Sequence, residues 1–370
     1  MSKPHSWQFP TDPSAIIERI QQIDPIRYGK TRNFIDGSVT LLSPYISRGA
    51  ITLPQILQTV LQKGYKPYAI EKLIQELAWR EFFQRVWFAK EQHIWNDLKQ
   101  PQQGVLHHEM PKAIADANTG ITAIDEQIQQ LYATGYMHNH ARMYVAGITC
   151  NLAGAYWLQP SRWMYYHLLD GDIASNTCSW QWIAGAFSSK KYIANQENIN
   201  RYLQSTQQNS FLDHPYETIF NQGVPEALKS TMQLDLHTPL PEISAPEIDA
   251  KKDICIYTSY WLNPTWRKEE DVQRILLLEP KHFERYPVSD KVLAFIIELA
   301  KAQIPDLKIF IGNYEALQLL MHPQQKTFFI DHPLHRHFGG IGDPYPWMFP
   351  QVKGYFPSFF SFWKKAQRYL

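Results

Sequence analysis

Cysteine and long apolar runs are both scarce in this chain. Its 370 residues include only Cys150, Cys178 and Cys255, an odd number of cysteines spread far apart. They are too few for a four-cysteine iron–sulfur cluster and do not suit a disulfide framework. No stretch approaches the roughly 18 apolar residues of a membrane span, and the N-terminal MSKPHSWQFPTDPS lacks the apolar core of a signal peptide. We therefore predict a cytoplasmic protein without an iron–sulfur cluster and without a membrane association.

The sequence also lacks an excess of charge of either sign. It has 36 Lys and Arg residues against 35 Asp and Glu residues, a net charge of +1. A nucleic acid would therefore have to be bound by a local basic patch and not by a globally basic field. What the chain does have is 44% hydrophobic and 14% aromatic residues, which is enough apolar material for two sizeable cores. We expect a folded, soluble monomer.

Helical periodicity dominates the chain up to about residue 210. Apolar residues recur at helical spacing in SAIIERIQQI, in AIEKLIQELAWREFFQRVWF and in ARMYVAGITCNLAGAYW. Residues 237–253 are rich in proline and have no helical period, which is typical of a linker. Beyond them, short β-branched runs such as ICIYTSYW and LKIFIGN surround the helical DKVLAFIIELAKAQ, which indicates a small parallel α/β domain.

The predicted fold is therefore mainly α, with an all-helical domain followed by a small C-terminal α/β domain. We place an N-terminal arm at 1–15, the helical domain at 16–236, the linker at 237–253, and the α/β domain with a C-terminal tail at 254–370.

Polar residues gather in two motifs, TGYMHNHARM and LLDGDIASNTCSWQW. A helix beginning near Asn139 would project Arg142 beside Met143. Asp170 and Asp172 flank a single glycine, so a tight turn can bring both carboxylates into one small volume, where an arginine could pair with one of them. Taken alone, such a pair is more often a structural ion pair between helices.

The order MHNxxRM, DGDxAxN and WQW, with LLSPYISRGAIT and ELAWREFF upstream, resembles the flavin-binding domain of the DNA photolyase and cryptochrome family. The resemblance covers roughly residues 28 to 200. It implies FAD as cofactor and damaged DNA as partner. It does not identify a second, antenna chromophore. The family usually places an α/β antenna domain before the helical domain. Residues 255–286 faintly resemble its opening, so the C-terminal α/β domain is either a displaced counterpart or an unrelated appendage.

Several residues match positions that contact the flavin in that family. Ser38, Thr40 and Ser43 correspond to phosphate contacts, and Asp170 and Asp172 to ring and ribose contacts. Asn176 would face the flavin N5, where an uncharged amide accepts from a protonated nitrogen and favours the reduced cofactor. The complete set that the resemblance assigns to the cofactor is Tyr28, Ser38, Thr40, Ser43, Arg80, Asn139, Arg142, Asp170, Asp172 and Asn176.

A second set matches the positions that contact DNA. The resemblance makes Glu76 the catalytic carboxylate that contacts the damaged bases, and makes Trp79 and Trp182 the two walls of a pocket for a flipped dimer. Helical spacing alone would make Glu76 and Arg80 a surface ion pair. The complete set is Arg32, Glu76, Trp79, Asn139, His140, Met143 and Trp182.

Trp180 and Trp157 match the proximal and middle members of the tryptophan chain that photoreduces the flavin in this family. The distal member is not evident, because the region that should hold it reads VLHHEMP, with His107 and His108. Trp95, Trp163 or a tyrosine such as Tyr144 could substitute. The alternative is that these indoles are ordinary core packing.

Two functions stay open: a light-driven lyase that splits pyrimidine dimers, and a cryptochrome-like photoreceptor without repair activity. His140 stands where the family commonly has an arginine directed at DNA phosphate, so a fixed charge is lost at neutral pH. The shortened architecture suggests single-stranded or exposed lesions, because flipping a base costs less there.

Two further motifs lie outside this resemblance. We predict no metal site and interpret the DHPLHRH motif, which contains Asp331, His332, His335 and His337, as a polar loop. The tail SFFSFWKKAQRYL could stack on nucleic acid, but we interpret it first as an amphipathic helix that docks on the core.

Overall fold

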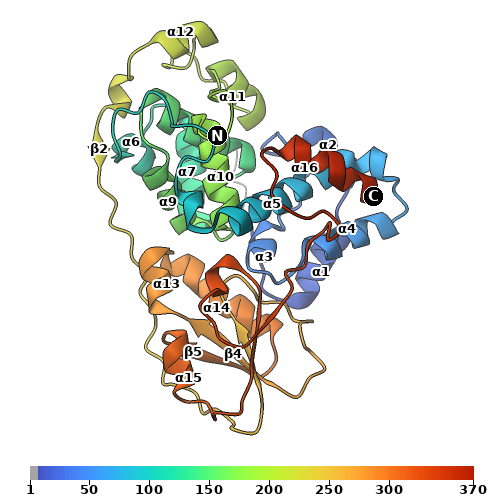
Figure 1. The fold of residues 1–370 in the computed structure, drawn as a ribbon. Helices are drawn as coiled ribbons and strands as arrows, with labels where there is room; N and C mark the ends of the chain where they lie inside the picture. The colour runs from blue at the N-terminus through green and yellow to red at the C-terminus, as the bar shows by residue number, and fades with distance from the viewer. Residues whose placement is uncertain (1–6) are drawn as a thin grey trace. The chain divides into compact units, whose positions relative to one another are not determined.

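The structure is a computed structural model that describes residues 7–370, so residues 1–6 of the predicted N-terminal arm lie outside the described residues. The chain groups into two compact units (Figure 1). The helical unit comprises the N-terminal residues up to Gln8, Asp24–Val39 and Lys90–Leu236. The mixed unit comprises Phe9–Ile23, Thr40–Ala89 and His237–Leu370.

The helical unit is built mainly from helices, and the predicted helix in ARMYVAGITCNLAGAYW is present as α8 (Asn139–Gly147) and η3 (Ile148–Leu152), which end at Leu152. Its main helices are α7 (Thr122–Thr134), α8 (Asn139–Gly147), α9 (Leu158–His167), α10 (Ile173–Ala184) and α11 (Gln196–Leu203). Shorter helices are α2 (Pro25–Thr31), η2 (Glu91–Trp95), α6 (Lys112–Ala115), α12 (Tyr216–Asn221) and η4 (Glu226–Leu228). The two short strands β1 (Met110–Pro111) and β2 (Thr231–Met232) pair antiparallel.

The ends of α7 and α8 agree with the sequence prediction. Gly135 closes α7 in the left-handed conformation, with φ of 73°, which glycine adopts without steric cost. Helix α8 begins at Asn139, and the imidazole of His138 caps it by accepting from the backbone N–H of His140. Helix α8 then runs into the π-helical turn η3 (Ile148–Leu152), a rare conformation that often occurs near functional sites.

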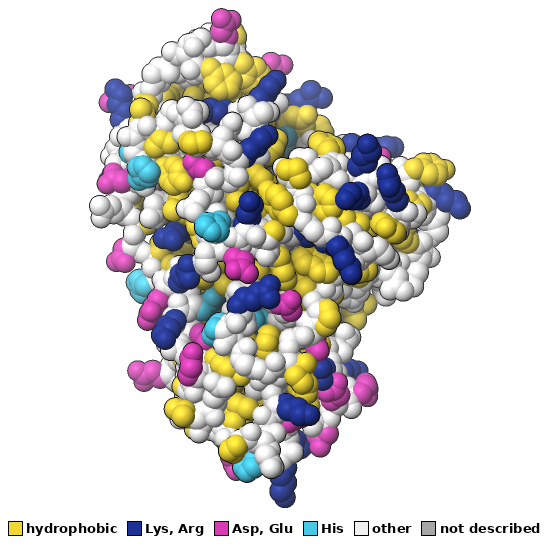
Figure 2. Space-filling view, in the orientation of Figure 1, with side chains coloured by type: hydrophobic (Ala, Val, Ile, Leu, Met, Phe, Trp, Pro, Cys, Tyr) yellow, Lys and Arg dark blue, Asp and Glu magenta, His cyan; other side chains and the backbone are white. Residues whose placement is uncertain are grey.

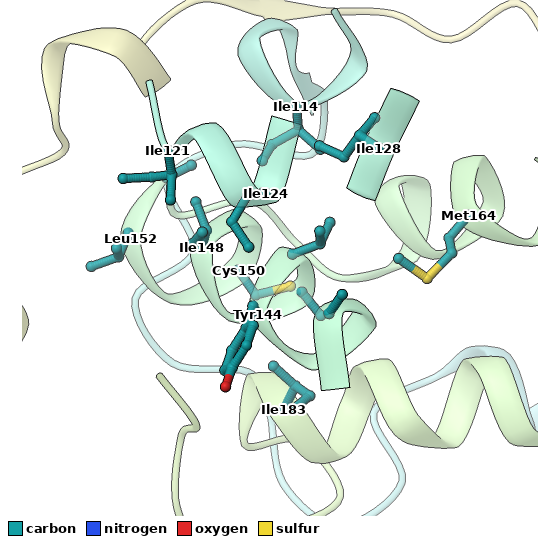
Figure 3. Packing of buried hydrophobic residues seen from close by; sticks show 14 of the residues in the cluster. Ile114, Ile121, Ile124, Ile128, Tyr144, Ile148, Cys150, Leu152, Met164 and Ile183 are labelled. Atoms are coloured by element: carbon teal, nitrogen blue, oxygen red, sulfur yellow. The ribbon is translucent and has the colours of Figure 1, made fainter. Parts of the chain in front are cut away.

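The core of the helical unit lies where α10 packs against α8 and α9. Figure 3 shows part of it, with aliphatic side chains from α7, η3 and α10 around the thiol of Cys150. Cys150 is fully buried, and this burial raises the pKa of its thiol far above the usual value. The thiol therefore behaves as a small apolar group in packing.

The mixed unit contains the predicted parallel sheet. The strands are β3 (Ile254–Tyr257), β4 (Gln273–Leu278), β5 (Leu307–Ile311), β6 (Thr327–Ile330) and β7 (Ile341–Asp343). They lie in the order β5-β4-β3-β6-β7, and all neighbouring pairs are parallel. Strands β4 and β5 are added on one side of β3, and β6 and β7 are then added on its other side, as in doubly wound folds.

Helices complete the mixed unit. Those within the α/β part are α13 (Pro280–Arg285), α14 (Asp290–Gln303), α15 (Tyr314–Gln318) and η5 (Pro333–His335). Those from the N-terminal segments are α1 (Pro13–Gln21), α3 (Ser43–Ser47), α4 (Leu53–Gln62), η1 (Pro67–Ile70) and α5 (Glu71–Lys90). The chain ends with α16 (Phe359–Ala366) and η6 (Gln367–Tyr369).

The grouping by contacts differs from the predicted domain boundaries. Residues 16–23 and 40–89, predicted to belong to the helical domain at 16–236, group with the α/β part, as do residues 9–15 of the predicted N-terminal arm. Long-range hydrogen bonds join both segments to it: the Gln303 side chain donates to the carbonyl of Thr11, and the backbone N–H of Leu262 donates to the carbonyl of Arg48. These partners lie far apart in the sequence, so periodicity could not reveal them.

Across residues 7–370, no helix has the length and apolarity needed to cross a membrane.

Candidate functional site

The centre of the candidate site is an ion pair between α8 and the turn before α10. Arg142 Nη2 lies 2.9 Å from Asp170 Oδ2, and Arg142 Nε donates to the carbonyl of Met137 at 2.8 Å. The guanidinium also lies over the ring of Tyr136, with 5.3 Å between its central carbon and the ring centroid. The Arg142 side chain is 20% exposed and that of Asp170 is 4% exposed, so the pair is fixed in place yet borders solvent.

The DGD turn positions the second carboxylate. Asp172 is the N-cap of α10, and its Oδ1 accepts from the backbone N–H of Ser175 at 2.7 Å. A Cβ at Gly171 would lie 2.9 Å from the carbonyl oxygen of Tyr165, so the turn has no room for a side chain there. The turn therefore directs Asp170 to Arg142 and Asp172 to the first turn of α10.

Asn176 lies one turn into α10, and its amide has a defined orientation. Its Nδ2 donates to the carbonyl of Ser161 at 2.8 Å. This bond uses the donor side of the amide and leaves Oδ1 as an acceptor on the other side. That is the arrangement required to receive a hydrogen bond from a protonated ring nitrogen.

Two buried polar atoms next to these residues test whether a polar cofactor fits. Among the described residues, Ser175 Oγ and Arg162 Nε have no hydrogen-bond partner. Ser175 precedes Asn176 in α10, and Arg162 follows Ser161 in α9. Buried polar atoms normally have partners, so these two fit a ligand that brings hydroxyl or phosphate oxygens. The donor set is therefore compatible with FAD.

Residues of the helical unit assigned to DNA are accessible at α8 and α10. Asn139 is exposed, Met143 is partly exposed, and Trp182 is 37% exposed. His140 is different, because burial lowers its pKa and its Nδ1 donates to the carbonyl of Asn33 at 3.0 Å. A neutral, tethered imidazole does not supply the fixed charge that a phosphate contact requires.

The entry segment of the predicted site is divided between the units. Tyr28 on α2 and Arg32, its C-cap, belong to the helical unit, as does Ser38, whose N–H donates to Thr31. Thr40 and Ser43 belong to the mixed unit, and Ser43 is the first residue of α3. Each is at least partly accessible.

Helix α5 of the mixed unit carries the other predicted residues. Glu76 and Trp79 are partly accessible, and Arg80 donates to the hydroxyl of Ser47. One face of Trp79 is covered by Phe359 of α16, with 3.8 Å between ring centroids and 9° between ring planes. Sequence reasoning missed this contact, because it joins residues 280 positions apart.

The predicted electron-transfer tryptophans are buried in the helical unit. Trp157 and Trp180 are 0% and 1% exposed. Trp157 Nε1 donates to Asp97 Oδ1 at 2.6 Å, and the hydroxyl of Tyr156 donates to the same oxygen at 3.0 Å. Asp97 and Tyr156 were not among the predicted residues. The adjacency of two aromatic residues in GAYW was the signal that could have found Tyr156.

The three candidates for the distal electron donor have other partners. Trp163 donates to the hydroxyl of Tyr132 at 2.9 Å, and Tyr144 donates to Asn198 at 2.7 Å. Trp95 lies beneath the guanidinium of Arg162. Tyr156 is partly accessible, as Trp95 is, and it lies 5.6 Å from Trp157 between ring centroids.

The DHPLHRH motif forms internal contacts. The His335 ring lies between Thr258 and the carbonyl of Ile330, and His337 contacts Glu279. Among residues 7–370, no cluster of three or more His, Cys, Asp or Glu side chains could hold a metal ion.

A family model provides the decisive comparison. The model described as the FAD binding domain of DNA photolyase matches residues 73–276, more than half of the chain. The chain belongs to this family. The match includes the α8 ion pair, the DGD turn, Asn176 and the α5 residues of this photolyase-family chain.

Curated relatives agree with the family. A deoxyribodipyrimidine photo-lyase of Alkalihalophilus pseudofirmus is 28% identical over 248 residues, covering 61% of this chain and 51% of the relative. The Escherichia coli deoxyribodipyrimidine photo-lyase is 28% identical over 236 residues, covering 59% and 47%. Cryptochrome DASH of Danio rerio is 28% identical over 235 residues, covering 57% and 41%. The photolyase-family chain spans about half the length of the curated relatives it matches.

Solved structures are similar over part of the fold. A cryptochrome of Synechocystis sp. is 24% identical, with a TM-score of 0.45 over 54% of this chain and 44% of that chain. A class III photolyase from Agrobacterium tumefaciens is 22% identical, with a TM-score of 0.42 over 52% and 44%.

Proposed function

We propose that this photolyase-family protein binds FAD and, under blue light, splits pyrimidine dimers in DNA, with a preference for single-stranded or otherwise exposed lesions. The observation that carries the proposal is the arrangement of Arg142, Asp170, Asp172 and Asn176 within the matched region. FAD, when bound and reduced, supplies the electron that opens the dimer and takes it back afterwards. The remaining steps depend on the side chains of this chain.

Cofactor binding rests on fixed polar groups. Arg142, held by Met137 and Asp170, presents a positive charge that suits an anionic cofactor. Asp172 is oriented by its capping bond to Ser175, so little side-chain entropy remains to be lost on binding. Asn176 offers its Oδ1 as an acceptor, which favours a protonated and hence reduced flavin ring.

Electron supply to the cofactor rests on Trp157, Trp180 and Tyr156. Asp97 accepts from the indole N–H of Trp157, and a carboxylate there favours the positive charge that forms when the indole loses an electron. The Tyr156 hydroxyl donates to the same carboxylate, so its proton has an acceptor when the ring is oxidised. Burial beside Asp97 raises the pKa of Tyr156 to about 12, so the hydroxyl is protonated at neutral pH. We assign the distal position to Tyr156.

Substrate binding rests on accessible aromatic and polar side chains. Asn139, Met143 and Trp182 in the helical unit offer one amide and two flat or flexible apolar surfaces to an extruded base. In the mixed unit, Glu76 offers a carboxylate and Trp79 a partly accessible ring. Because His140 is neutral, it adds no electrostatic affinity for the phosphates of a duplex. This favours binding of lesions that need no strand separation.

A cryptochrome-like photoreceptor is the second candidate function. The observation that favours it is the stacking of Phe359 on Trp79, which joins the C-terminal helix to a residue assigned to the lesion pocket. A tail in that place can report a change around α5 to a partner. Light-dependent protease sensitivity of α16, without repair, would support this candidate over the first.

The deciding experiment uses the purified, flavin-reduced protein and a short single-stranded oligonucleotide that carries a cyclobutane dimer. Dimer loss under blue light is compared with a dark control, with Glu76→Ala and with Glu298→Ala, an exposed glutamate in α14. Repair that needs light, falls in Glu76→Ala and persists in Glu298→Ala supports the lyase. A flavin-loaded protein that leaves the dimer intact in single and double strands rejects it.

A further inference from the structure

The last 27 residues carry positive charge only. Residues 344–370 contain four basic side chains and no acidic one, although the whole chain has a net charge of only +1. The four basic side chains are Lys353, Lys364, Lys365 and Arg368, and all of them are exposed. This segment is therefore the kind of local basic patch that a nearly neutral protein needs in order to bind a polyanion.

Helix α16 divides its side chains between two faces. Phe359, Phe362 and Trp363 are buried, and together with Ala366 they dock the helix on the mixed unit. The predicted docking helix is thus confirmed. The outward face instead presents Phe360, which is 71% exposed, and Lys364 one turn later.

The outward face continues into the last residues of the chain. Arg368 follows Lys364 by one further turn in η6, and Tyr369 is 53% exposed. Figure 2 shows dark blue Lys and Arg side chains interleaved with yellow hydrophobic ones over α16. Cations and flat rings therefore alternate on one surface, which we call the α16 surface and define by Phe360, Lys364, Lys365, Arg368 and Tyr369.

We infer that the α16 surface binds single-stranded DNA. The inference rests on the proposed function for the choice of DNA as partner, and it adds a contact surface that is separate from the matched flavin-domain motifs. The cations meet the phosphates, and the rings of Phe360 and Tyr369 stack on bases. Stacking requires exposed base faces, which single strands offer and an intact duplex does not.

An anionic membrane is the competing partner for a basic amphipathic helix. Such a helix needs its apolar face free to enter the lipid interface. In α16 that face is already used inside the protein, because Phe362 and Trp363 are 0% and 5% exposed and Phe359 stacks on Trp79. The outward rings of Phe360 and Tyr369 are suited to stack on bases but offer too small an apolar area to anchor a helix in lipid.

The test measures binding of the full-length protein, in the dark, to a labelled undamaged single-stranded oligonucleotide. Phe360→Ala removes a stacking ring and should weaken binding about tenfold. The triple variant Lys364→Gln, Lys365→Gln, Arg368→Gln should lower the slope of log affinity against log salt by about 2. Matched controls are Phe220→Ala, an exposed ring on α12, and the triple Lys281→Gln, Lys301→Gln, Lys326→Gln, and both should bind like wild type.

Circular dichroism and flavin content establish that each variant is folded. Binding that is unchanged in both α16 variants overturns the inference. It is also overturned if the wild type binds phosphatidylserine vesicles through these residues and does not bind the oligonucleotide. Oligonucleotide binding that depends on the α16 surface, in a protein without repair activity, upholds this inference and rejects the lyase. Dimer repair, together with an oligonucleotide affinity that is the same in the α16 variants and the wild type, supports the lyase and rejects this inference.

Discussion

Two arginine–carboxylate pairs with the same 2.9 Å separation differ in their surroundings. In the mixed unit, Arg85 and Glu81 of α5 are 8% and 1% exposed, and Glu81 also accepts from the backbone N–H groups of Met348 and Phe349. In the helical unit, Arg142 is 20% exposed, and its other contacts are the carbonyl of Met137 and the ring of Tyr136. The first pair is enclosed by the protein, whereas the second borders solvent.

The difference shows how structural and functional ion pairs can be told apart. Both lie in segments that resemble the flavin-binding domain, so the sequence pattern alone does not separate them. Burial and hydrogen-bond satisfaction do. Removing one partner of a pair that is enclosed and bonded to backbone donors should destabilise the fold, whereas a pair that borders solvent can accept a further partner.

The largest effect should follow from removing the closed pair. Glu81→Ala leaves Arg85 charged and buried and leaves the N–H groups of Met348 and Phe349 without an acceptor. We expect a loss of about 3–5 kcal/mol in the free energy of unfolding, measured by urea denaturation, with earlier proteolysis near residue 348. The control Glu298→Ala changes an exposed carboxylate and should shift stability by less than about 0.5 kcal/mol. A Glu81→Ala protein as stable as this control would mean that the closed pair is not structural.

The second-largest effect should be a loss of folding stability of the mixed unit at acidic pH. His332 and His335 are 4% and 3% exposed, and burial lowers the pKa of His335 to about 4 and that of His332 well below the usual value. An unfolded histidine has a pKa of about 6.5, so between pH 6.5 and 4 the unfolded chain binds more protons than the folded chain. Stability is therefore complete above pH 6.5 and falls as the pH drops, by about 1–3 kcal/mol for His335.

The check is the melting temperature as a function of pH. A protein that carries His335→Gln should lose less stability between pH 6.5 and 4 than the wild type does. Identical slopes for the two proteins would show that His335 is not protonated on unfolding in this range.

Opening the second pair should cost less stability than opening the first and should weaken cofactor binding. Arg142→Gln leaves the buried carboxylate of Asp170 with a neutral amide in place of a cation, and we expect the free energy of unfolding to fall by about 1–3 kcal/mol. Flavin affinity should fall at least about tenfold, because an anionic cofactor loses its fixed cation. Flavin absorbance after gel filtration and urea denaturation of the same sample measure both quantities. An Arg142→Gln protein that loses much stability but keeps its flavin would show that the Arg142–Asp170 pair is structural and does not bind the cofactor.

The smallest effect on stability should come from Tyr156→Phe. The ring and its packing on Trp157 remain, and only a partly accessible hydrogen bond to Asp97 is lost. We expect slower photoreduction of the flavin in the presence of an external reductant, with unchanged flavin content. Tyr144→Phe, which removes a hydroxyl bonded to Asn198, is the matched control. Equal photoreduction in both variants would exclude Tyr156 as the distal donor.

Local features of the fold were predictable and distant ones were not. The start of α8 at Asn139, the C-cap of α7 at Gly135 and the DGD turn follow from short-range rules on helix ends and glycine. The parallel strands after residue 253 follow from β-branched runs that alternate with a helix. The roles assigned to individual site residues by the resemblance stay predictions.

The remaining features depend on contacts between distant residues. Nothing in ELAWREFF indicates that Glu81 accepts hydrogen bonds from the backbone N–H groups of residues 348 and 349, or that Phe359 stacks on Trp79. Asp97 beneath Trp157 has no sequence signature either, because the two side chains meet across 60 positions. Tertiary packing decides these contacts, and a single sequence carries no local signal for them.

The bond from Phe349 to Glu81 spans 268 residues, which has a consequence for biosynthesis. Helix α5 leaves the ribosome early, and at about 5–20 residues per second it waits roughly 15–50 seconds for its last partner to be made. During this interval the Glu81 carboxylate and the apolar side of α5 lack the C-terminal segment that covers them. The mixed unit can therefore close only after residue 349 has been synthesised, and until then α5 exposes apolar surface of the kind that chaperones bind.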